Sequence, residues 1–533
     1  MGFQPEELAA DARPAIVETV TCHSDKAPSP PNWSPLFRHL CEFGPSVFGD
    51  VLVNLIQNPN INSSWLFRAD ILYDSAASES QGPGPGPDDE LGPPSETDNT
   101  SPGPVRIPSF AGHELERTIV RRLIPRNTLR DKPLDQTCLI YQSVSNRKEE
   151  EEEHDVVIPE ESTLVIYLPH VADGGEMPFY HPVVKGIAFL HSWAVAESTG
   201  SISISYQFFN EAEDRSTVKL TRTALRLLEV IHKHGKGRLA GYQKRVHHDQ
   251  ILPQARVQNT YAQLKRKYAR ELIESWAETT DPEKHVFEDL CIAAFLVELW
   301  ADMYGRPSRQ TPFPGFVDIG CGNGLLVYIL NREGFRGWGF DARARKSWST
   351  YNTKFIAPSG SEEDTLQELV LLPAPVSSGE EITTTTLPQD RIHNGRFPKG
   401  TFIISNHADE LTPWTPILAT LSECPFIAIP CCSHNLAGER YRAPPPRDKT
   451  KADSAYSSLV AWVADIATDC GWEVEQEMLR IPSTRNTALI GRRRSRGAEA
   501  VDVEAIVQRY GGAAGYLASV VKLVTSTSSG GEH

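Results

Sequence analysis

The stretch at residues 315–343, GFVDIGCGNGLLVYILNREGFRGWGFDAR, decides the fold because its hydrophobic pattern changes from strand to turn to helix and back to strand. Residues 316–319 are apolar apart from one aspartate, which is typical of a strand buried on both faces of a parallel sheet. Gly320, Gly322 and Gly324 follow directly and predict a tight turn with bare backbone.

A helix and a second strand follow this glycine turn. Residues 325–333 carry apolar side chains at helical spacing, and Gly334 stands where a left-handed helix C-cap is expected. The next strand ends at Asp341. The whole has the length of a βαβ unit, about thirty residues. The glycine turn therefore lies at the carboxyl edge of a sheet, where open α/β folds bind ligands.

The glycine turn and Asp341 together predict a cofactor that contains a ribose. Bare backbone lets a ligand approach the main chain, and an acidic residue about 20 positions further on accepts hydrogen bonds from ribose hydroxyls. The spacing is G-x-G-x-G, preceded by Asp318, and a carboxylate there repels a diphosphate but suits a cationic amino acid end. This favours S-adenosylmethionine over NAD, although a plain tight βα connection is an alternative. The predicted cofactor-binding residues are Asp318, Gly320, Gly322, Gly324, Asp341 and Asn406.

Asn406 belongs to a second polar loop, ISNHADELTPW at residues 404–414. The loop follows an apolar strand, so we expect it at the same sheet edge, where it would receive the methyl acceptor. It lacks the N-P-P-Y motif of enzymes that methylate amide or amino nitrogens. His407, Asp409 and Glu410 are suited instead to bind or deprotonate a hydroxyl, and they are the predicted catalytic residues. The alternative is that Asp409 and Glu410 cap the following helix.

Cysteine usage predicts neither a disulfide framework nor a metal site. The nine cysteines lack paired C-x-x-C spacing, as expected of a reduced intracellular protein. Cys431, Cys432 and His434 resemble metal ligands, but adjacent cysteines rarely face one ion, so core packing is favoured.

The charge pattern leaves room for RNA binding in local patches. A chain of 533 residues with a net charge of −16 has no uniformly basic coat. Basic residues nevertheless cluster in residues 231–250, 264–270 and 480–496, where a solvated helix face is the alternative to a phosphate-binding surface. The predicted RNA-binding residues are Lys244, Arg245, His247, His248, Lys265, Arg266, Lys267 and Arg485.

No segment predicts a secretory signal or a membrane span. Residues 1–20 lack a basic region followed by an apolar run, and the most apolar helix, residues 286–300, is short and interrupted by acidic residues. We therefore expect a soluble, cytoplasmic protein.

The predicted fold is α/β: a Rossmann-like methyltransferase sheet with a β-rich amino-terminal region and a helical connecting segment. A helix ended by Gly235 and Gly237 and another N-capped by Asp281 lie in the connecting segment, and a strand hairpin at residues 471–493 closes the sheet. The predicted segments are an N-terminal segment (1–74), a disordered linker (75–104), the largely antiparallel β-rich region (105–215), the basic helical region (216–310), the methyltransferase domain (311–497), and a C-terminal helix and tail (498–533).

Six segments in order resemble the tRNA uridine-44 2′-O-methyltransferase family. They are KRVHHDQILPQ (244–254), residues 267–300, residues 316–348, SNHADELTPW (405–414), PCC (430–432) and LRIPSTRN (479–486). The resemblance covers residues 244–491 and is weak over the first hundred residues. It implies transfer of a methyl group from S-adenosylmethionine to the ribose 2′-hydroxyl of uridine 44 in the variable region of serine tRNAs. The alternatives are a methyltransferase of another RNA or of a protein, and a non-catalytic RNA-binding scaffold.

Overall fold

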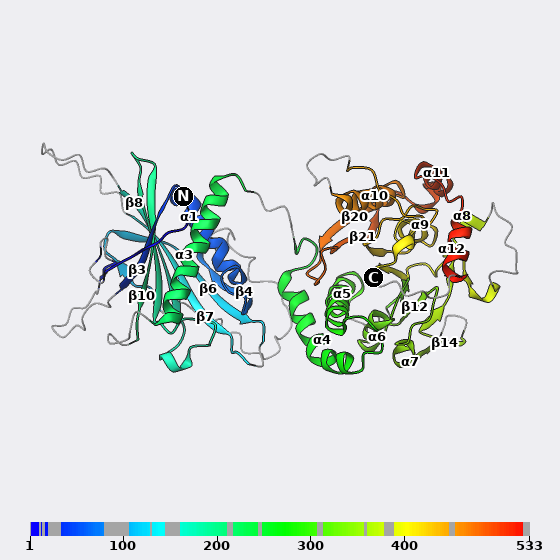
Figure 1. The fold of residues 1–533 in the computed structure, drawn as a ribbon, viewed down its shortest axis with the longest axis horizontal. Coiled ribbons are helices and arrows are strands. Elements are labelled where there is room, and N and C mark those ends of the chain that lie inside the picture. Colours follow the sequence, from blue (N-terminus) through cyan, green and yellow to red (C-terminus); the bar gives the residue numbers. More distant parts are fainter. Residues whose placement is uncertain are drawn as a thin grey trace, which may run out of the picture. The chain divides into compact units, whose positions relative to one another are not determined.

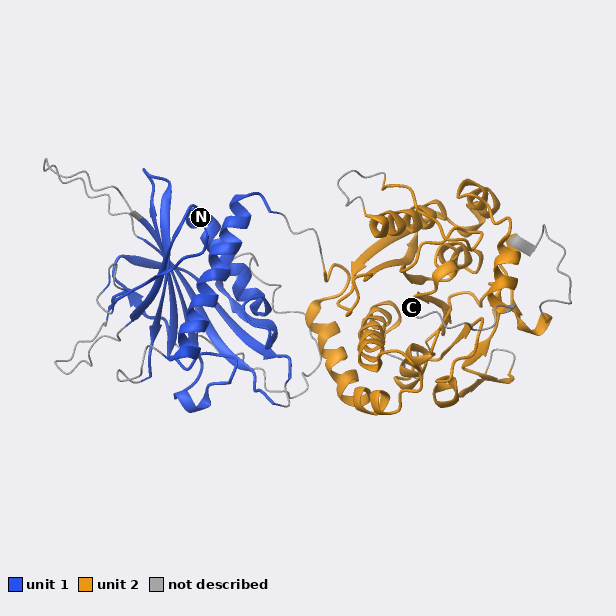
Figure 2. Cartoon of the chain, viewed as in Figure 1, with its two compact units in different colours: residues 1–243 blue, residues 244–533 orange. Residues whose placement is uncertain are grey.

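The computed structural model divides the chain into two compact units, residues 1–243 and 244–533, which are described one at a time (Figure 2). The acidic run at residues 149–153, and the predicted linker beyond Ser78, lie outside the described residues. The described residues are 2–9, 12, 16–19, 33–78, 106–127, 130–143, 160–209, 217–242, 248–305, 313–356, 360–377, 388–446 and 454–525.

The first unit is built on a ten-stranded antiparallel sheet (Figure 1). Its order is β1-β3-β10-β9-β8-β7-β6-β5-β2, and β4 pairs with β6. The predicted β-rich amino-terminal region is thereby confirmed. The strands are β1 (Glu6–Glu7), β2 (Glu18–Thr19), β3 (Ser34–Cys41), β4 (Leu66–Asp74), β5 (Ser109–Phe110), β6 (His113–Pro125), β7 (Leu134–Ser143), β8 (Glu160–Pro169), β9 (Gly186–Ala194) and β10 (Thr199–Gln207).

Helices α1 (Pro45–Gln57) and α3 (Val218–Leu239) bury their apolar side chains in one core with this sheet. The prediction that Gly235 and Gly237 end the second of these helices is wrong, because α3 continues to Leu239. Gly235 serves packing instead, since a Cβ there would lie 2.4 Å from Cε1 of Phe43. The short elements are α2 (Ser75–Ser78), η1 (Pro59–Ile61) and η2 (Gly174–Glu176).

The second unit contains a seven-stranded sheet of order β15-β12-β11-β18-β19-β21-β20. The first five strands are parallel, and β21 runs antiparallel to both β19 and β20, as the predicted closing hairpin requires. The strands are β11 (Phe316–Ile319), β12 (Gly337–Asp341), β15 (Leu366–Glu368), β18 (Phe402–Asn406), β19 (Phe426–Ile429), β20 (Trp472–Met478) and β21 (Thr487–Arg494). Two small pairs are β13 (Lys354–Ile356) with β14 (Glu362–Asp364), and β16 (Val370–Leu371) with β17 (Ile392–His393).

Helices cover both faces of this sheet, and the alternation within β11 shows how. Phe316 packs in one core with α4, α5 and α6, whereas Val317 and Ile319 pack in the other with α9 and α10. Asp281 caps α5 as predicted, because its side chain accepts from the Glu283 amide at 3.0 Å. The helices are α4 (Gln254–Glu274), α5 (Pro282–Tyr304), α6 (Leu325–Arg332), α7 (Trp348–Tyr351), α8 (Ala374–Ser377), α9 (Thr415–Leu421), α10 (Ala455–Asp469), α11 (Val503–Arg509) and α12 (Tyr516–Thr525), with 3-10 turns η3 (Gln389–Arg391), η4 (Asp409–Leu411) and η5 (Ala498–Ala500).

The compact units group the chain differently from the segments expected from the sequence. Residues 1–74 supply β1 to β4 and α1 to the first unit. Residues 216–310 are divided, since α3 belongs to the first unit and α4 and α5 to the second. In the carboxyl-terminal stretch, α11 and α12 bury side chains in a core of the second unit. Among the described residues, every helix is too short or too polar to cross a bilayer.

Candidate active site

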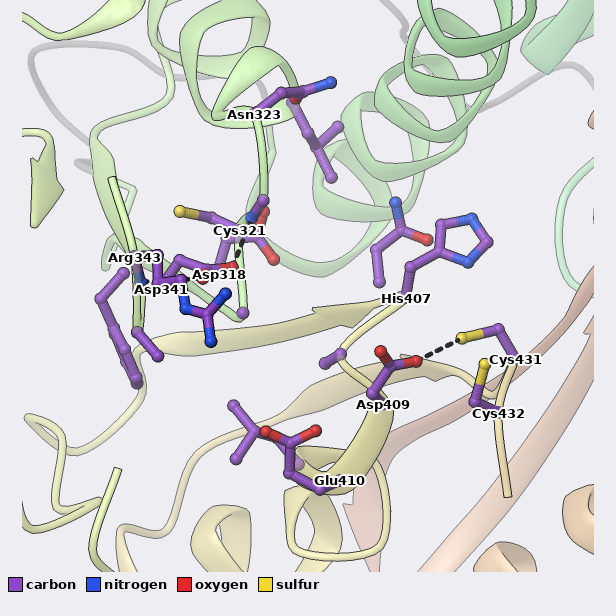
Figure 3. Close-up of a pocket in the computed structure, with 18 of the residues that line it drawn as sticks. Asp318, Cys321, Asn323, Asp341, Arg343, His407, Asp409, Glu410, Cys431 and Cys432 are labelled. Atoms are coloured by element: carbon purple, nitrogen blue, oxygen red, sulfur yellow. Dashed lines mark hydrogen bonds between the residues drawn. The ribbon is translucent and has the colours of Figure 1, made fainter. Parts of the chain in front are cut away.

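A cavity of about 680 Å³ opens where the parallel strands of the second unit end (Figure 3). Its walls come from the glycine turn after β11, the end of β12, the loops after β18 and β19, and residues 483–485. Residues of α5, α6, β16 and α12 also line the cavity. The topology brings these distant segments together, because neighbouring parallel strands end at one sheet edge.

The three glycines of the turn all have a positive φ: +72° at Gly320, +52° at Gly322 and +76° at Gly324. Residues with a Cβ are disfavoured in this left-handed region. A Cβ at Gly324 would lie 2.5 Å from Leu366 Cδ1, and one at Gly320 would lie 3.2 Å from Ala408 Cβ. At Gly322 it would meet no atom within 4 Å. Packing therefore requires Gly320 and Gly324, whereas Gly322 presents bare backbone to the cavity.

Asp341, at the end of β12, holds this turn in place. Its Oδ2 accepts from the Gly322 amide at 3.0 Å, and its Oδ1 accepts from the Arg343 amide at 3.2 Å. Burial raises the pKa of this carboxyl, although the charge of Arg345 opposes the shift. A carboxylate oxygen has lone pairs beyond one amide bond, so Asp341 can also accept from ribose hydroxyls.

Two buried oxygens beside the glycine turn have no hydrogen-bond partner: Oδ1 of Asp318 and Oδ1 of Asn406. Both residues line the cavity. Burial raises the pKa of Asp318, and the charges of Asp289 and Asp341 raise it further. An unpaired buried acceptor destabilises the folded protein by about 1–3 kcal/mol, so a hydrogen-bond donor on a ligand would stabilise both oxygens. The residues fit S-adenosylmethionine: Asp318 and Asn406 would hold its amino acid end, and Asp341 its ribose.

Helix α5 adds acidic groups to the cavity that the sequence analysis did not identify. Glu288 and Asp289 line the cavity, although their side chains are largely buried. Burial raises the pKa of Asp289 to about 7, and the charge of Glu288 acts in the same direction. The sequence treats these residues only as interruptions of an apolar helix. The spacing in the sequence could have identified them. His285 lies three positions before Glu288 and four before Asp289, so the three side chains share one helix face.

His407 links the acceptor loop to α5. Its Nε2 lies 3.1 Å from Oε1 of Glu288, and its φ is +53°, a strained conformation of the kind that clusters at functional sites. Burial, the largest single effect, lowers the pKa of His407, but the hydrogen bond and charge of Glu288 and the charges of Asp289 and Asp409 together raise it. When Nε2–H donates to Glu288, the lone pair of the neutral ring is on Nδ1 and can take a proton.

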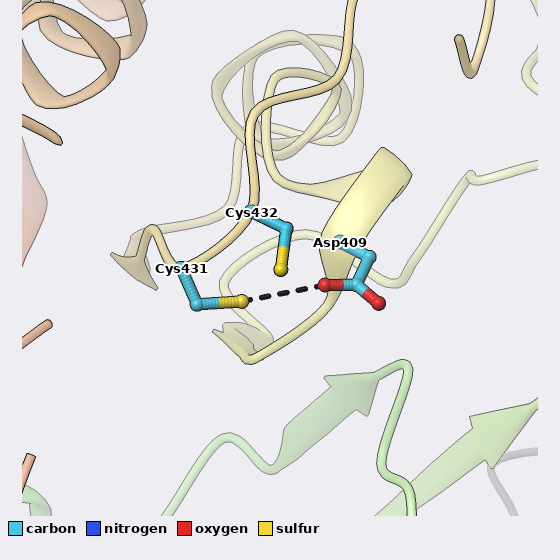
Figure 4. A group of neighbouring side chains, drawn as sticks. All are labelled: Asp409, Cys431 and Cys432. Atoms are coloured by element: carbon cyan, nitrogen blue, oxygen red, sulfur yellow. Dashed lines mark hydrogen bonds between the residues drawn. The ribbon is translucent and has the colours of Figure 1, made fainter. Parts of the chain in front are cut away.

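Asp409 lies beside the two adjacent cysteines (Figure 4). The Cys431 thiol donates to Asp409 Oδ1 at 3.3 Å, and the potential ligand atoms of Asp409, Cys431 and Cys432 all lie within 4.8 Å of one another. Hydrogen bonding between thiol and carboxylate accounts for this arrangement, and the absence of a metal site stays a prediction. The expected core packing is wrong for Cys432, which is exposed and lines the cavity, and His434 is only half-buried.

Glu410 completes the set of predicted catalytic residues. Burial raises its pKa to about 6, so it changes charge near neutral pH. The alternative in which Asp409 and Glu410 cap the next helix is wrong, because Trp414 is the N-cap of α9 and no side chain caps that helix. The structure thus brings His407, Asp409 and Glu410 to one cavity, and their catalytic roles stay predictions.

The predicted RNA-binding residues are dispersed, and several contact other parts of the protein. Lys244, Arg245 and His247 lie outside the described residues. Of the four others, His248 precedes α4 and the rest lie on it. His248 Nδ1 contacts the Met478 carbonyl, Lys265 Nζ lies 4.5 Å from the centre of the Phe287 ring, Lys267 pairs with Glu333 at 2.7 Å, and Arg266 is exposed. The phosphate-binding role of α4 stays a prediction, weakened by these internal partners.

Arg485 is the predicted RNA-binding residue that lies at the cavity. It donates to the Cys431 carbonyl, and its guanidinium carbon lies 5.6 Å from the centre of the Tyr456 ring. Tyr516 and Val520 of α12 line another part of the wall. Sequence reasoning missed these two because apolar residues in a terminal helix carry no signal of which cavity they face.

The second unit is an α/β sheet covered by helices on both faces. The glycine turn, the carboxylate after the next strand and the buried acidic groups lie at one edge of this sheet. This combination defines an S-adenosylmethionine-dependent methyltransferase. Residues 251–358 match the family described as "Predicted AdoMet-dependent methyltransferase". Residues 8–245 match the "TRM44-like, N-terminal bet v1-like domain". The expectation that the resemblance fades over the first hundred residues is therefore wrong.

The chain belongs to the tRNA (uracil-O(2)-)-methyltransferase family. It is 60% identical to the protein of that name from Neurospora crassa, over 100% of this chain and 99% of the relative. Identity is 40% to the Aspergillus oryzae protein, over 85% of this chain and 81% of the relative. Identity is 39% to the Schizosaccharomyces pombe protein, over 86% of this chain and 85% of the relative.

Proposed function

We propose that this protein transfers a methyl group from S-adenosylmethionine to the ribose 2′-hydroxyl of a uridine in tRNA. The observation that carries the acceptor is the loop after β18, where His407, its partner Glu288 and Asp409 line the cavity that also contains the glycine turn. The printed name of the relatives supports tRNA as substrate and uridine as the nucleoside.

The finer proposals rest on the family resemblance stated above. They are position 44 in the variable region, serine tRNAs as the substrate set, a Rossmann-like classification of the catalytic sheet, and a cytoplasmic location. The sheet order and the ligand-binding edge are consistent with that classification.

The reaction follows from the charge and placement of these groups. When bound, S-adenosylmethionine would supply an electrophilic methyl group: a C–O bond to the 2′-oxygen would form as the C–S bond breaks, and the electron pair would leave on sulfur as a neutral thioether. The hydroxyl proton passes to Nδ1 of His407, while Glu288 stabilises the imidazolium through Nε2. Placement of the hydroxyl in line supplies a large share of the rate, since the sulfonium is already activated.

The test is transfer of labelled methyl to total tRNA, followed by digestion and mass spectrometry of the nucleosides. The expected product is 2′-O-methyluridine. A methyl group on the O2 atom of the uracil base, or label found only on protein, contradicts the 2′-hydroxyl proposal. A serine tRNA whose uridine 44 is replaced by cytidine tests the position, and methylation elsewhere in that variant overturns it.

A further inference from the structure

The first unit carries an exposed group of aromatic and basic side chains that none of the roles above uses. Trp65 and Phe179 are 45% and 56% exposed, and their ring centres lie 5.5 Å apart in a T-shaped contact. They come from distant segments, the start of β4 and the connection between β8 and β9. Aromatic side chains are enriched at interaction surfaces, so an exposed pair in mutual contact indicates such a surface.

A cation lies over each ring. The guanidinium carbon of Arg130 is 5.7 Å from the centre of Trp65, and Lys219 Nζ is 4.3 Å from the centre of Phe179. The backbones of two further basic residues lie next to the pair. The Arg126 amide donates to the Trp65 carbonyl at 2.9 Å, and the Lys132 carbonyl accepts from the hydroxyl of Tyr180, next to Phe179, at 2.8 Å. We call Trp65, Phe179, Arg126, Arg130, Lys132 and Lys219 the aromatic–basic patch.

The four cations of this patch have no carboxylate partner among the residues that the structure describes, and the ammonium of Lys219 donates to the Phe179 carbonyl at 3.0 Å. Within the described part of the chain, Arg126, Arg130, Lys132 and Lys219 form no ion pair, whereas on α4 Lys267 pairs with Glu333 and Arg270 with Glu274. The patch thus gathers four basic side chains on a chain with a net charge of −16, with the carboxyls of Asp131 and Asp135 near Tyr180. Flat rings combined with unpaired cations match nucleic acid chemistry, because bases stack on the rings and phosphates pair with the cations.

We propose that the aromatic–basic patch is a second RNA-binding site, on which an unpaired nucleobase of the substrate RNA stacks while Arg130 and Lys219 contact the adjoining phosphates. The inference rests on the proposed tRNA substrate and adds a contact outside the catalytic unit. Aromatic stacking tolerates any base, so this site contributes affinity rather than choice of nucleotide.

The test uses the full chain and an unmodified serine tRNA transcript, with affinity measured by fluorescence anisotropy at several salt concentrations. Trp65→Ala and Phe179→Ala should each weaken binding by about 5- to 150-fold. Arg130→Gln and Lys219→Gln should also weaken it and lower the salt slope by about one phosphate contact each. Affinity for S-adenosylmethionine, measured by calorimetry, should stay at the parent value in all four variants.

Two matched controls separate this site from a general loss of exposed side chains. Tyr73→Ala removes an aromatic that is 42% exposed at the other end of β4, and Arg226→Ala removes a cation of α3 that pairs with Glu229. Both should bind tRNA like the parent. If the four patch variants bind and methylate tRNA like an active parent, the patch is not an RNA site and only this inference is overturned. A parent that neither binds nor methylates tRNA overturns the proposed function as well.

Discussion

His407 Nε2 lies 3.1 Å from Glu288 Oε1, which joins the acceptor loop to helix α5 across the cavity. Glu288 is only 4% exposed, so its charge is poorly screened by water and acts strongly on the ring. Burial is the largest single effect and lowers the pKa of His407, but the hydrogen bond and charge of Glu288, together with the charges of Asp289 and Asp409, raise it overall. A base with an oriented ring and a raised pKa is a stronger proton acceptor once it is neutral.

Glu288→Gln should therefore change the pH dependence of methyl transfer as well as its rate. Without the carboxylate the pKa of His407 falls, so the acidic limb of the single-turnover rate should move to lower pH. The plateau should drop because the ring is a weaker base. The measurement is single-turnover methylation between about pH 5 and pH 9. A plateau that drops while the limb stays in place would assign Glu288 a merely structural role.

Asp289 should make the unliganded protein less stable as pH rises. Burial raises its folded-state pKa to about 7, above the ordinary value of 3.8. Both states bind the proton at low pH, and only the folded state resists losing it, so stability falls as pH rises between these two values. Asp289→Asn should accordingly raise the melting temperature at about pH 8 and leave it almost unchanged at about pH 4. Thermal unfolding without cofactor measures this, and equal shifts at both pH values contradict it.

The catalytic sheet was predictable because its signals are local. The turn requires a positive φ at Gly320, Gly322 and Gly324, and the sequence has a glycine at each of these three positions. The N-cap at Asp281 is equally local, since its carboxylate bonds the Glu283 amide two residues away. Such features depend on neighbours in the sequence, so a single chain suffices to find them.

Features that depend on tertiary packing could not be predicted in the same way. Gly235 has the appearance of a helix end, but it is there because Phe43, nearly two hundred residues earlier, packs against it. Glu288 looks like a break in an apolar helix until the fold brings His407 to it. The contact of Asp409 with Cys431 joins the loops after β18 and β19, and only the parallel topology makes these loops neighbours.

Gly322 and Gly324 should respond differently to the same substitution. Gly322→Ala places a methyl group where no protein atom lies within 4 Å, so it should fold at a cost of about 1–2 kcal/mol for the positive φ and lose cofactor affinity. Gly324→Ala places its Cβ 2.5 Å from Leu366 Cδ1, so it should lower the melting temperature more strongly. Calorimetry with S-adenosylmethionine and thermal unfolding separate the two effects. Parent-like cofactor affinity in folded Gly322→Ala contradicts the assigned site.

Asp341→Asn tests the ribose contact at the same site. The amide keeps the size of the side chain but has only one acceptor oxygen, so the Gly322 amide, the Arg343 amide or a ribose hydroxyl loses a partner. Cofactor affinity should fall by roughly tenfold, as expected for one hydrogen bond to a charged group. Arg345→Gln is the control, because its guanidinium is 4.0 Å from Asp341 and half exposed, and it should change affinity little. Equal affinity in Asp341→Asn and the parent would remove Asp341 from the cofactor site.

His407→Ala and Asp409→Asn should lower turnover while cofactor affinity stays near the parent value, since both side chains extend into the cavity from the loop after β18 and not from the glycine turn (Figure 3). Loss of a general base costs about 10²–10⁴-fold in rate, so His407→Ala should fall within that range. Cys431→Ala removes the thiol that donates to Asp409 and should reproduce part of the Asp409→Asn loss. Treatment of the parent with a chelator should change nothing if the thiol and carboxylate hold each other without an ion. A stoichiometric metal in the purified protein, with activity lost on chelation, would show instead that Asp409, Cys431 and Cys432 are ligands.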